Sequence, residues 1–503
     1  MRIDFTADCI VSRFVAGLGS QLLFGVSLQM SFGRTALSAT LVLALAACGG
    51  GDSNPPPTTV VAPTPTPTPP PSGITQQLEF AEAVLDEWYL FPDLLDNGVQ
   101  TSSFNDVQAY LDARVAPARA QDIDRGFTFA TSIAEENELI NSGSTAGFGI
   151  LLAYDTTNNR VFLLEAYEAG NGFQAGMDRG TELLGIATPG QAEQTVSSLM
   201  ASGGPQAVVD ALGPSDPGVT RTLRFAQVNG TVITADVTKS DFSLDPISDR
   251  YGALILNDGG KQVGYINLRT FIVADASDQL RDAFALFQAN GVTELIIDLR
   301  YNGGGLVSVA DTFGDLMGAG RVGQVWSETV LRASKSSENS TEFFQAEANA
   351  IAPTKIAFIG RGGTASASEL VINSMIPYVD AANIALIGSN TFGKPVGQFG
   401  FDLAEFDLRI RATTFQTNNA DGDGEYYSGL ASVVPNTCQA SDDIFTALGD
   451  TGEASIATAL AFLNGVACSP ISGGGITTQS VGGREVLQPS RPSAAQYQIP
   501  GVF

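Results

Sequence analysis

The chain has 503 residues, of which 44% are hydrophobic, so it is long enough for two or three domains with apolar cores. Its formal net charge of −27 argues against nucleic acid as a partner, because phosphate binding needs clusters of basic side chains. The chain contains no histidine, which excludes Ser-His-Asp and Cys-His catalytic machinery.

The first residues carry the pattern of an export signal. Arg34 precedes an apolar run over 41–47 that is too short to span a bilayer, and three glycines follow Cys48. The sequence Leu45-Ala46-Ala47-Cys48 resembles the bacterial lipobox, whose cysteine is lipidated, and cleavage without a lipid is the alternative. We therefore predict a lipoprotein signal peptide over 30–47 with lipidation at Cys48, and we interpret 1–29 as a mis-assigned start.

Residues 48–73 are rich in proline and threonine, which predicts an extended, semi-rigid tether after the lipid anchor. The folded part would then face the periplasm of a bacterial cell envelope, held at the outer membrane by the lipid. From residue 74 apolar residues recur at three- and four-residue spacing, and a second helical pattern around 107–115 ends near Pro117. These patterns predict a small helical N-terminal domain over 74–140.

Strand patterns dominate residues 145–242. Apolar runs at 147–152 and 161–164 flank a turn, and a short helix is predicted over 194–200 before two further strands. This order resembles a PDZ domain of the bacterial type, and Gly147-Phe148-Gly149-Ile150 matches its carboxylate-binding loop. Backbone N–H groups in such a loop can bind the carboxylate at the end of a peptide, and an ordinary hairpin glycine pair is the alternative reading.

Residues 250–437 alternate between strand and helix patterns, which predicts an α/β core with a largely parallel sheet. The segments are strands near 263–268, 294–300, 355–360 and 384–387, with helices over 276–289, 307–317 and 370–379. Glycines follow the strand that ends at Arg300, and they allow a ligand to approach the backbone there.

The C-terminal residues contain two further cysteines. Cys438 and Cys468 lie close together in a chain that we expect to be exported, so we predict a disulfide that closes a helical segment over 438–470. Two buried free thiols are the alternative. Residues 471–503 carry no recognisable motif, and their role is unknown.

A serine and a lysine stand out in the α/β core. Without histidine, a serine hydrolase would need a lysine as its base, and Lys394 is the lysine in a glycine-rich loop bounded by apolar residues. The spacing of 388–394 also matches a phosphate-binding loop, but Pro395 stands where that motif requires Ser or Thr. Ser366 begins a helix as Ser-x-x-Glu, and this pattern is equally a capping box that needs no catalysis.

Three motifs in order resemble the carboxy-terminal processing, or tail-specific, proteases. They are Asp298-Leu299-Arg300-x-Asn302-x-Gly304-Gly305, Thr364-Ala365-Ser366-Ala367-Ser368-Glu369 and Thr391-Phe392-Gly393-Lys394. The stretch from Asp122 to Phe129 looks like the segment that precedes the PDZ domain in this family. The resemblance covers about residues 75–437 and implies a multidomain α/β protein with a helical N-terminal domain, a PDZ-like domain and a crotonase/ClpP-like peptidase core.

The resemblance also implies roles for single residues. The family's nucleophile falls on Ser366, its base on Lys394 and its supporting glutamine on Gln398, while Phe392, Val396 and Phe399 would desolvate the lysine. Backbone N–H groups of Ala367, Gly303 and Gly304 would form the oxyanion hole. The implied function is an exported serine endopeptidase that forms an acyl-enzyme and captures the free C-termini of protein substrates, without metal or cofactor.

The sequence departs from the family in several places, and two rival readings remain. Thr364 replaces the first serine of the serine motif, and the interval between Ser366 and Lys394 is longer than usual, with the extra length near 377–383. One rival is a non-catalytic peptide- or ligand-binding lipoprotein on the same scaffold. The other is a latent protease whose PDZ domain must bind a partner before Ser366 and Lys394 align. The Asn/Asp/Gly run over 418–425 suggests calcium superficially, but it lacks the remaining ligands of a calcium loop and favours a hairpin turn.

Overall fold

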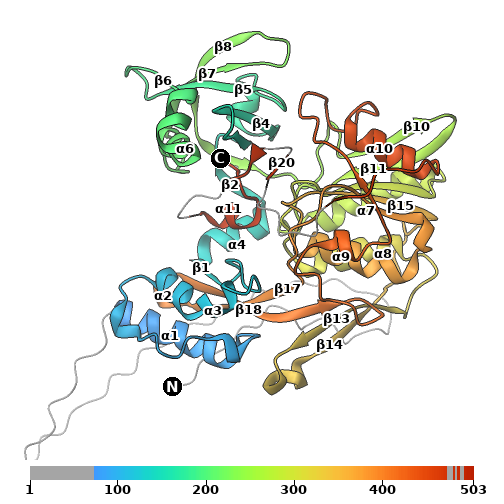
Figure 1. Ribbon diagram of the computed structural model, residues 1–503, viewed down its shortest axis with the longest axis horizontal. Helices are drawn as coiled ribbons and strands as arrows, with labels where there is room; N and C mark the ends of the chain where they lie inside the picture. Colours follow the sequence, from blue (N-terminus) through green and yellow to red (C-terminus); the bar gives the residue numbers. More distant parts are fainter. Residues whose placement is uncertain (1–72, 473–479, 482–483, 488–491) are drawn as a thin grey trace, which may run out of the picture. The chain divides into compact units, whose positions relative to one another are not determined.

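The computed structural model describes residues 73–472, 480–481, 484–487 and 492–503 (Figure 1). The predictions for the signal peptide, Cys48 and most of the tether lie outside the described residues. Within the described ranges, no helix combines the length and the apolar character needed to cross a membrane.

The described strands form sheets of five, six and eight strands and a two-stranded ribbon. The protein is therefore a mixed α/β protein of several structural units, as the sequence predicts. The helices have the following bounds: α1 (Gly73–Trp88), α2 (Val107–Arg114), α3 (Ala116–Arg119), α4 (Ile133–Ser142), α5 (Asn171–Gln174), α6 (Val196–Leu212), α7 (Ala276–Ala289), α8 (Val307–Met317), α9 (Ala367–Met375), α10 (Ala454–Leu463) and α11 (Ala494–Gln498).

The six-stranded sheet is the centre of the α/β core. Its order is β10-β11-β12-β15-β16-β19, and every neighbouring pair is parallel except β10 with β11. Successive strand residues alternate between two apolar clusters: one contains residues of α7, α8 and α9, and the other contains residues of α10. A parallel sheet covered on both faces explains the nearly continuous apolar runs of its strands. The strands are β10 (Ala253–Asp258), β11 (Lys261–Asn267), β12 (Glu294–Asp298), β15 (Lys355–Gly360), β16 (Ile384–Gly388) and β19 (Asn436–Gln439).

The N-terminal helices have no separate core. Apolar residues of α1 and α2 share one buried cluster with Phe401, Leu408, Ile410 and Ala412, which come from two long strands about 300 residues later in the sequence. Those strands, β17 and β18, belong to the five-stranded sheet, in which β18 lies between β1 and β13. The helical segment is therefore an added layer on this sheet. The strands are β1 (Phe129–Ser132), β13 (Val325–Leu331), β14 (Ser340–Phe343), β17 (Val396–Leu403) and β18 (Leu408–Asn418).

The eight-stranded sheet holds the segment that resembles a PDZ domain. Its order is β20-β21-β3-β4-β5-β7-β8, with β6 paired to β5, and residues of α6 pack on its apolar face. Helix α6 is longer than the predicted 194–200 because it continues past a kink at Gly204 and Pro205. The strands are β3 (Ile150–Asp155), β4 (Arg160–Ala166), β5 (Glu182–Ala187), β6 (Gln194–Thr195), β7 (Thr220–Ala226), β8 (Val232–Thr238), β20 (Ser480–Val481) and β21 (Arg484–Glu485), and the ribbon pairs β2 (Ser144–Gly147) with β9 (Ser240–Ser243).

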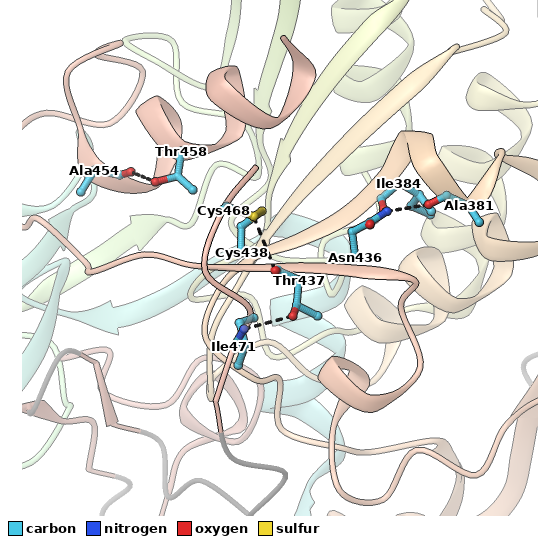
Figure 2. Close-up of a disulfide and its surroundings, with 9 residues drawn as sticks. All are labelled: Ala381, Ile384, Asn436, Thr437, Cys438, Ala454, Thr458, Cys468 and Ile471. Carbon is cyan, nitrogen blue, oxygen red and sulfur yellow. Dashed lines mark hydrogen bonds between the residues drawn. A yellow bond between two sulfur atoms is a disulfide. The ribbon is translucent and has the colours of Figure 1, made fainter. Parts of the chain in front are cut away.

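The two C-terminal cysteines are joined. A disulfide links Cys438 in β19 to Cys468, with a Cα–Cα distance of 5.3 Å (Figure 2). Beside it, the N–H of Ile471 donates to the Thr437 hydroxyl at 3.0 Å. The disulfide closes the segment that carries α10, which covers one face of the parallel sheet, so it ties this helix to the edge strand.

Candidate active site

Ser366 lies in the turn between β15 and α9, at the carboxyl end of the parallel strands. The turn is anchored by Thr364, whose hydroxyl accepts from the Arg361 N–H at 2.9 Å and donates to the Leu299 carbonyl at 2.7 Å. Ser366 has a φ of +55°, a conformation that non-glycine residues seldom adopt and that is held here by the surrounding bonds. The predicted capping box with Glu369 is also present, so this partly buried serine begins the helix as a cap as well as lying in the turn.

Glu369 joins the serine turn to the lysine loop. Its Oε2 atom accepts from the N–H of Ser366 at 3.2 Å and from the N–H of Lys394 at 2.7 Å, so one oxygen holds both residues side by side. Its Oε1 atom accepts from the Gly393 N–H at 2.7 Å and from the Thr391 hydroxyl at 2.6 Å. Burial raises the pKa of Glu369, and the donated bonds oppose that rise. Glu369 therefore connects the Ser366 turn to the loop that carries Lys394.

Lys394 follows β16, and its amine is held by Gln398. The lysine Nζ donates to Gln398 Oε1 at 3.2 Å, and it lies 5.1 Å from the centre of the Phe127 ring. Desolvation lowers the pKa of Lys394 from 10.5 to about 8, while the negative charges of Asp124 and Glu369 limit the drop. Among the described residues, no carboxylate forms an ion pair with this amine. A lysine in this state can exist as a neutral base near pH 8.

The segment 124–128 completes the lysine pocket, a role that sequence reasoning missed. The Gln398 amide donates to the Phe127 carbonyl at 2.8 Å, which orients its oxygen toward the lysine. Arg125 donates to the carbonyls of Phe392 and Gly393 at 2.6 and 2.7 Å and fixes the loop that carries Lys394. The only signal in the sequence was the Asp122–Phe129 stretch, which we read as a marker of the family and not as a wall of the site.

The buried carboxylate of Asp124 holds this segment in shape. It accepts from the N–H of Phe127 at 2.8 Å and from the hydroxyls of Thr128 and Tyr89 at 2.7 and 3.0 Å. Tyr89 follows α1, so the N-terminal helical layer contacts the wall of the lysine pocket directly.

The glycine loop after β12 lies against Ser366. A Cβ atom added to Gly304 would lie 2.8 Å from the Ser366 Cβ and 2.9 Å from the Ala367 nitrogen, so only glycine fits this approach. The Gly304 N–H, one of the three predicted oxyanion donors, donates to Asn302 Oδ1 at 2.9 Å within the same loop. The N–H groups of Gly303 and Ala367 have no acceptor among the described residues.

The same loop is supported by a buried ion cluster. Arg300 bonds to Asp298 at 2.7 Å, to Glu453 at 2.9 Å and to Asp442 at 3.2 Å, and all four side chains are fully buried or nearly so. Asp442 also accepts from Arg179, which lies in the turn that precedes β5 of the eight-stranded sheet. The cluster fixes the end of β12, where the glycine loop begins.

The other predicted binding positions are also placed. Gly147, Phe148, Gly149 and Ile150 form the connection between β2 and β3, and Gly149 has a φ of +74° with its Cα packed against Gly170. In the Asn/Asp/Gly run, Asn419 Oδ1 accepts from the N–H groups of Asp421 and Asp423 at 3.0 Å, as a turn requires. The described residues contain no cluster of three or more His, Cys, Asp or Glu side chains that could hold a metal ion.

Comparisons with known proteins agree with these motifs. Residues 262–430 match the model of peptidase family S41. The chloroplastic C-terminal processing peptidase of Tetradesmus obliquus is 26% identical over 66% of this chain and 68% of its own length. The carboxyl-terminal-processing protease of Synechocystis is 24% identical over 53% of this chain and 57% of its own length.

A solved structure agrees on the fold. A Bacteroides fragilis protein assigned to the S41 proteases matches with a TM-score of 0.59 and 21% identity, over 77% of this chain and 97% of its own. Residues 262–430 therefore match peptidase family S41, and the chain is similar to carboxyl-terminal processing proteases over about two thirds of its length.

Proposed function

We propose that this chain is a serine endopeptidase in which Ser366 is the nucleophile, Lys394 is the general base and Gln398 orients the lysine amine. One observation carries the proposal: the Lys394 amine has a pKa near 8, has no carboxylate partner among the described residues, and belongs to a loop that Glu369 ties to the Ser366 turn. A lysine that only stabilised the fold would be expected to form an ion pair or reach solvent.

The chemistry follows from these positions. The neutral Nζ of Lys394 takes the proton from the Ser366 hydroxyl, whose oxygen attacks the carbonyl carbon of the scissile peptide bond. The resulting oxyanion accepts hydrogen bonds from the N–H groups of Ala367 and Gly303, at the positively polarised start of α9. The lysine then returns the proton to the leaving amine, and an acyl-enzyme remains. Water, deprotonated by the same lysine, hydrolyses this ester.

The substrates are proteins whose C-terminal segments bind a PDZ-like unit. The loop from Gly147 to Ile150 leads into β3, and an extended peptide that paired with the start of β3 would place its carboxylate at the loop. The conformation of Gly149, which a larger residue would disturb, supports a loop shaped for close backbone approach.

The compartment is extracytoplasmic. The disulfide between Cys438 and Cys468 forms and persists in oxidising compartments, and this supports the export that the N-terminal residues predict, with an anchor at Cys48 facing the periplasm. Mass spectrometry of the intact protein from envelope fractions would detect both the disulfide and the lipid. A protein with free thiols and no acyl mass would contradict the assignment.

Proteolysis tests the central proposal. Purified protein is incubated with an unfolded protein substrate and, separately, with a phosphonate probe that reacts with activated serines. We expect cleavage and labelling by the wild type, loss of both in Ser366→Ala, and no effect of Ser308→Ala, an exposed serine on α8. Undiminished cleavage by Ser366→Ala or by Lys394→Met would refute the assignment, and absence of labelling in all forms would favour the non-catalytic binding protein.

A further inference from the structure

The last residues of the described chain form an extra strand on the eight-stranded sheet. The Ile150 N–H donates to the Phe503 carbonyl at 3.0 Å, and the Phe503 N–H donates to the Ile150 carbonyl at 2.8 Å. The Leu152 N–H donates to the Gly501 carbonyl at 2.9 Å, and Leu151 and Val502 form an antiparallel bridge. Residues 501–503 therefore extend the sheet along the edge of β3 that faces away from β4.

The side chains of this strand enter two different apolar clusters. Phe503 is 2% exposed and packs in the cluster that contains the apolar residues of α6, such as Val196 and Met200. Val502 is 3% exposed and packs in the neighbouring cluster with Ile272. Successive side chains of a strand point to opposite faces of the sheet, as these two do. On the side of Phe503, the groove between β3 and α6 contains a pocket that holds the phenyl ring.

The predicted carboxylate-binding loop lies at the end of the added strand. A Cβ atom built on Gly147 would lie 2.6 Å from the Phe503 carbonyl carbon, so the absence of a side chain there allows the strand to approach. Gly501 has a φ of +86°, and a Cβ at that position would lie 2.7 Å from Val486. The groove thus accepts a small residue two positions before the phenylalanine.

The same segment reaches the proposed catalytic centre at its other end. The Gln498 carbonyl oxygen would lie 2.3 Å from a Cβ atom on Gly303, the proposed oxyanion donor. The Tyr497 ring stacks on Phe129 with centroids 3.9 Å apart, and the Gln496 amide donates to the Val502 carbonyl at 2.9 Å. Residues 493–503 thus run from the glycine loop to the peptide groove in one docked piece.

We propose that the groove between β3 and α6 binds peptides that carry glycine, a β-branched residue and phenylalanine in this order, and that residues 499–503 of this chain occupy it as an internal ligand. The consequence for proteolysis rests on the proposed function: a substrate end must displace this segment before it can bind. Because a tethered ligand has an effective concentration on the order of millimolar, the internal segment lowers the apparent affinity for added peptide by about tenfold or more.

Peptide binding tests this proposal independently of proteolysis. A fluorescent peptide with the sequence of residues 494–503 is titrated into full-length protein that carries Ser366→Ala, and fluorescence polarisation is read. We expect about tenfold or more tighter binding in Phe503→Asp than in the parent, and no change in Phe343→Ala, a phenylalanine that is 38% exposed on β14. The same peptide with an amidated end separates the contribution of the carboxylate from that of the strand.

Amide hydrogen exchange distinguishes the loss of the internal ligand from a folding defect in Phe503→Asp. The Ile150 and Leu152 amides should exchange faster in Phe503→Asp and recover protection with added peptide, while the Leu163 amide, bonded to the Thr181 carbonyl, should not change. Equal peptide affinity in parent and Phe503→Asp, with Leu163 protected in both, would overturn the proposal. Loss of protein cleavage without a change in these results would instead refute the peptidase assignment alone.

Discussion

Replacing Lys394 with methionine should stabilise the fold at neutral pH while removing the proposed base. The pKa of Lys394 is lowered from 10.5 to about 8, and this difference corresponds to roughly 3 kcal/mol of unfavourable free energy for holding the charged amine in the fold. The penalty is fully present below pH 8, because there the lysine amine is charged in both the folded and the unfolded protein. It is relieved as pH rises from 8 to 10.5, where the folded state is already neutral.

The net effect includes one lost hydrogen bond. Methionine cannot donate to Gln398, which costs about 1 kcal/mol, so the expected gain in the free energy of unfolding at pH 7 is about 2 kcal/mol. Urea denaturation at pH 7 and pH 10 measures this gain and its disappearance. The matched control is Lys261→Met, which removes a partly exposed ion pair with Glu294 and should change stability by less than about 1 kcal/mol.

The same pKa predicts the pH dependence of proteolysis by the wild type. With a pKa near 8, about a tenth of the lysine is neutral at pH 7 and about nine tenths at pH 9, so kcat/KM should rise about tenfold over this range. Peptide cleavage measured at constant ionic strength gives the profile. A flat profile between pH 6 and pH 9, or a Lys394→Met protein less stable than the wild type at pH 7, would refute the reasoning.

Three further predictions concern the supports of the site. Glu369→Ala leaves main-chain N–H groups at both catalytic loops without an acceptor, so we expect a loss of roughly 3–5 kcal/mol in urea denaturation together with loss of cleavage. Arg300→Met leaves the buried carboxylates of Asp298 and Glu453 without a counterion, so we expect it to cost about 3–5 kcal/mol in urea denaturation, and a loss below about 1 kcal/mol would contradict this expectation. Reduction of the Cys438–Cys468 disulfide should destabilise the fold by about 3–4 kcal/mol, seen as a lower Tm with reductant and no shift in Cys438→Ala.

The sequence by itself determined the α/β core and the identity of the proposed catalytic pair. Strands of the parallel sheet are buried on both faces, so their apolar runs are visible without knowledge of their partners, and the bounds of α7 and α8 were predicted to the residue. The absence of histidine and the scarcity of lysine favoured Lys394 as a base, and the resemblance of the three motifs to the processing proteases assigned the nucleophile to Ser366. These signals are local or compositional, so they can be identified in one sequence without knowledge of the tertiary contacts.

Only the tertiary structure decided how the proposed catalytic pair is held and which residues lie beside it. Phe127, Glu369 and Phe503 act through partners that are far away in the sequence, and a hydrogen bond or buried contact across such a separation leaves no periodic trace. For the same reason the helical segment was predicted as a domain of its own, although its apolar face is completed by β17 and β18. Hydrophobic periodicity reports that a face is buried, and the fold alone decides what buries it.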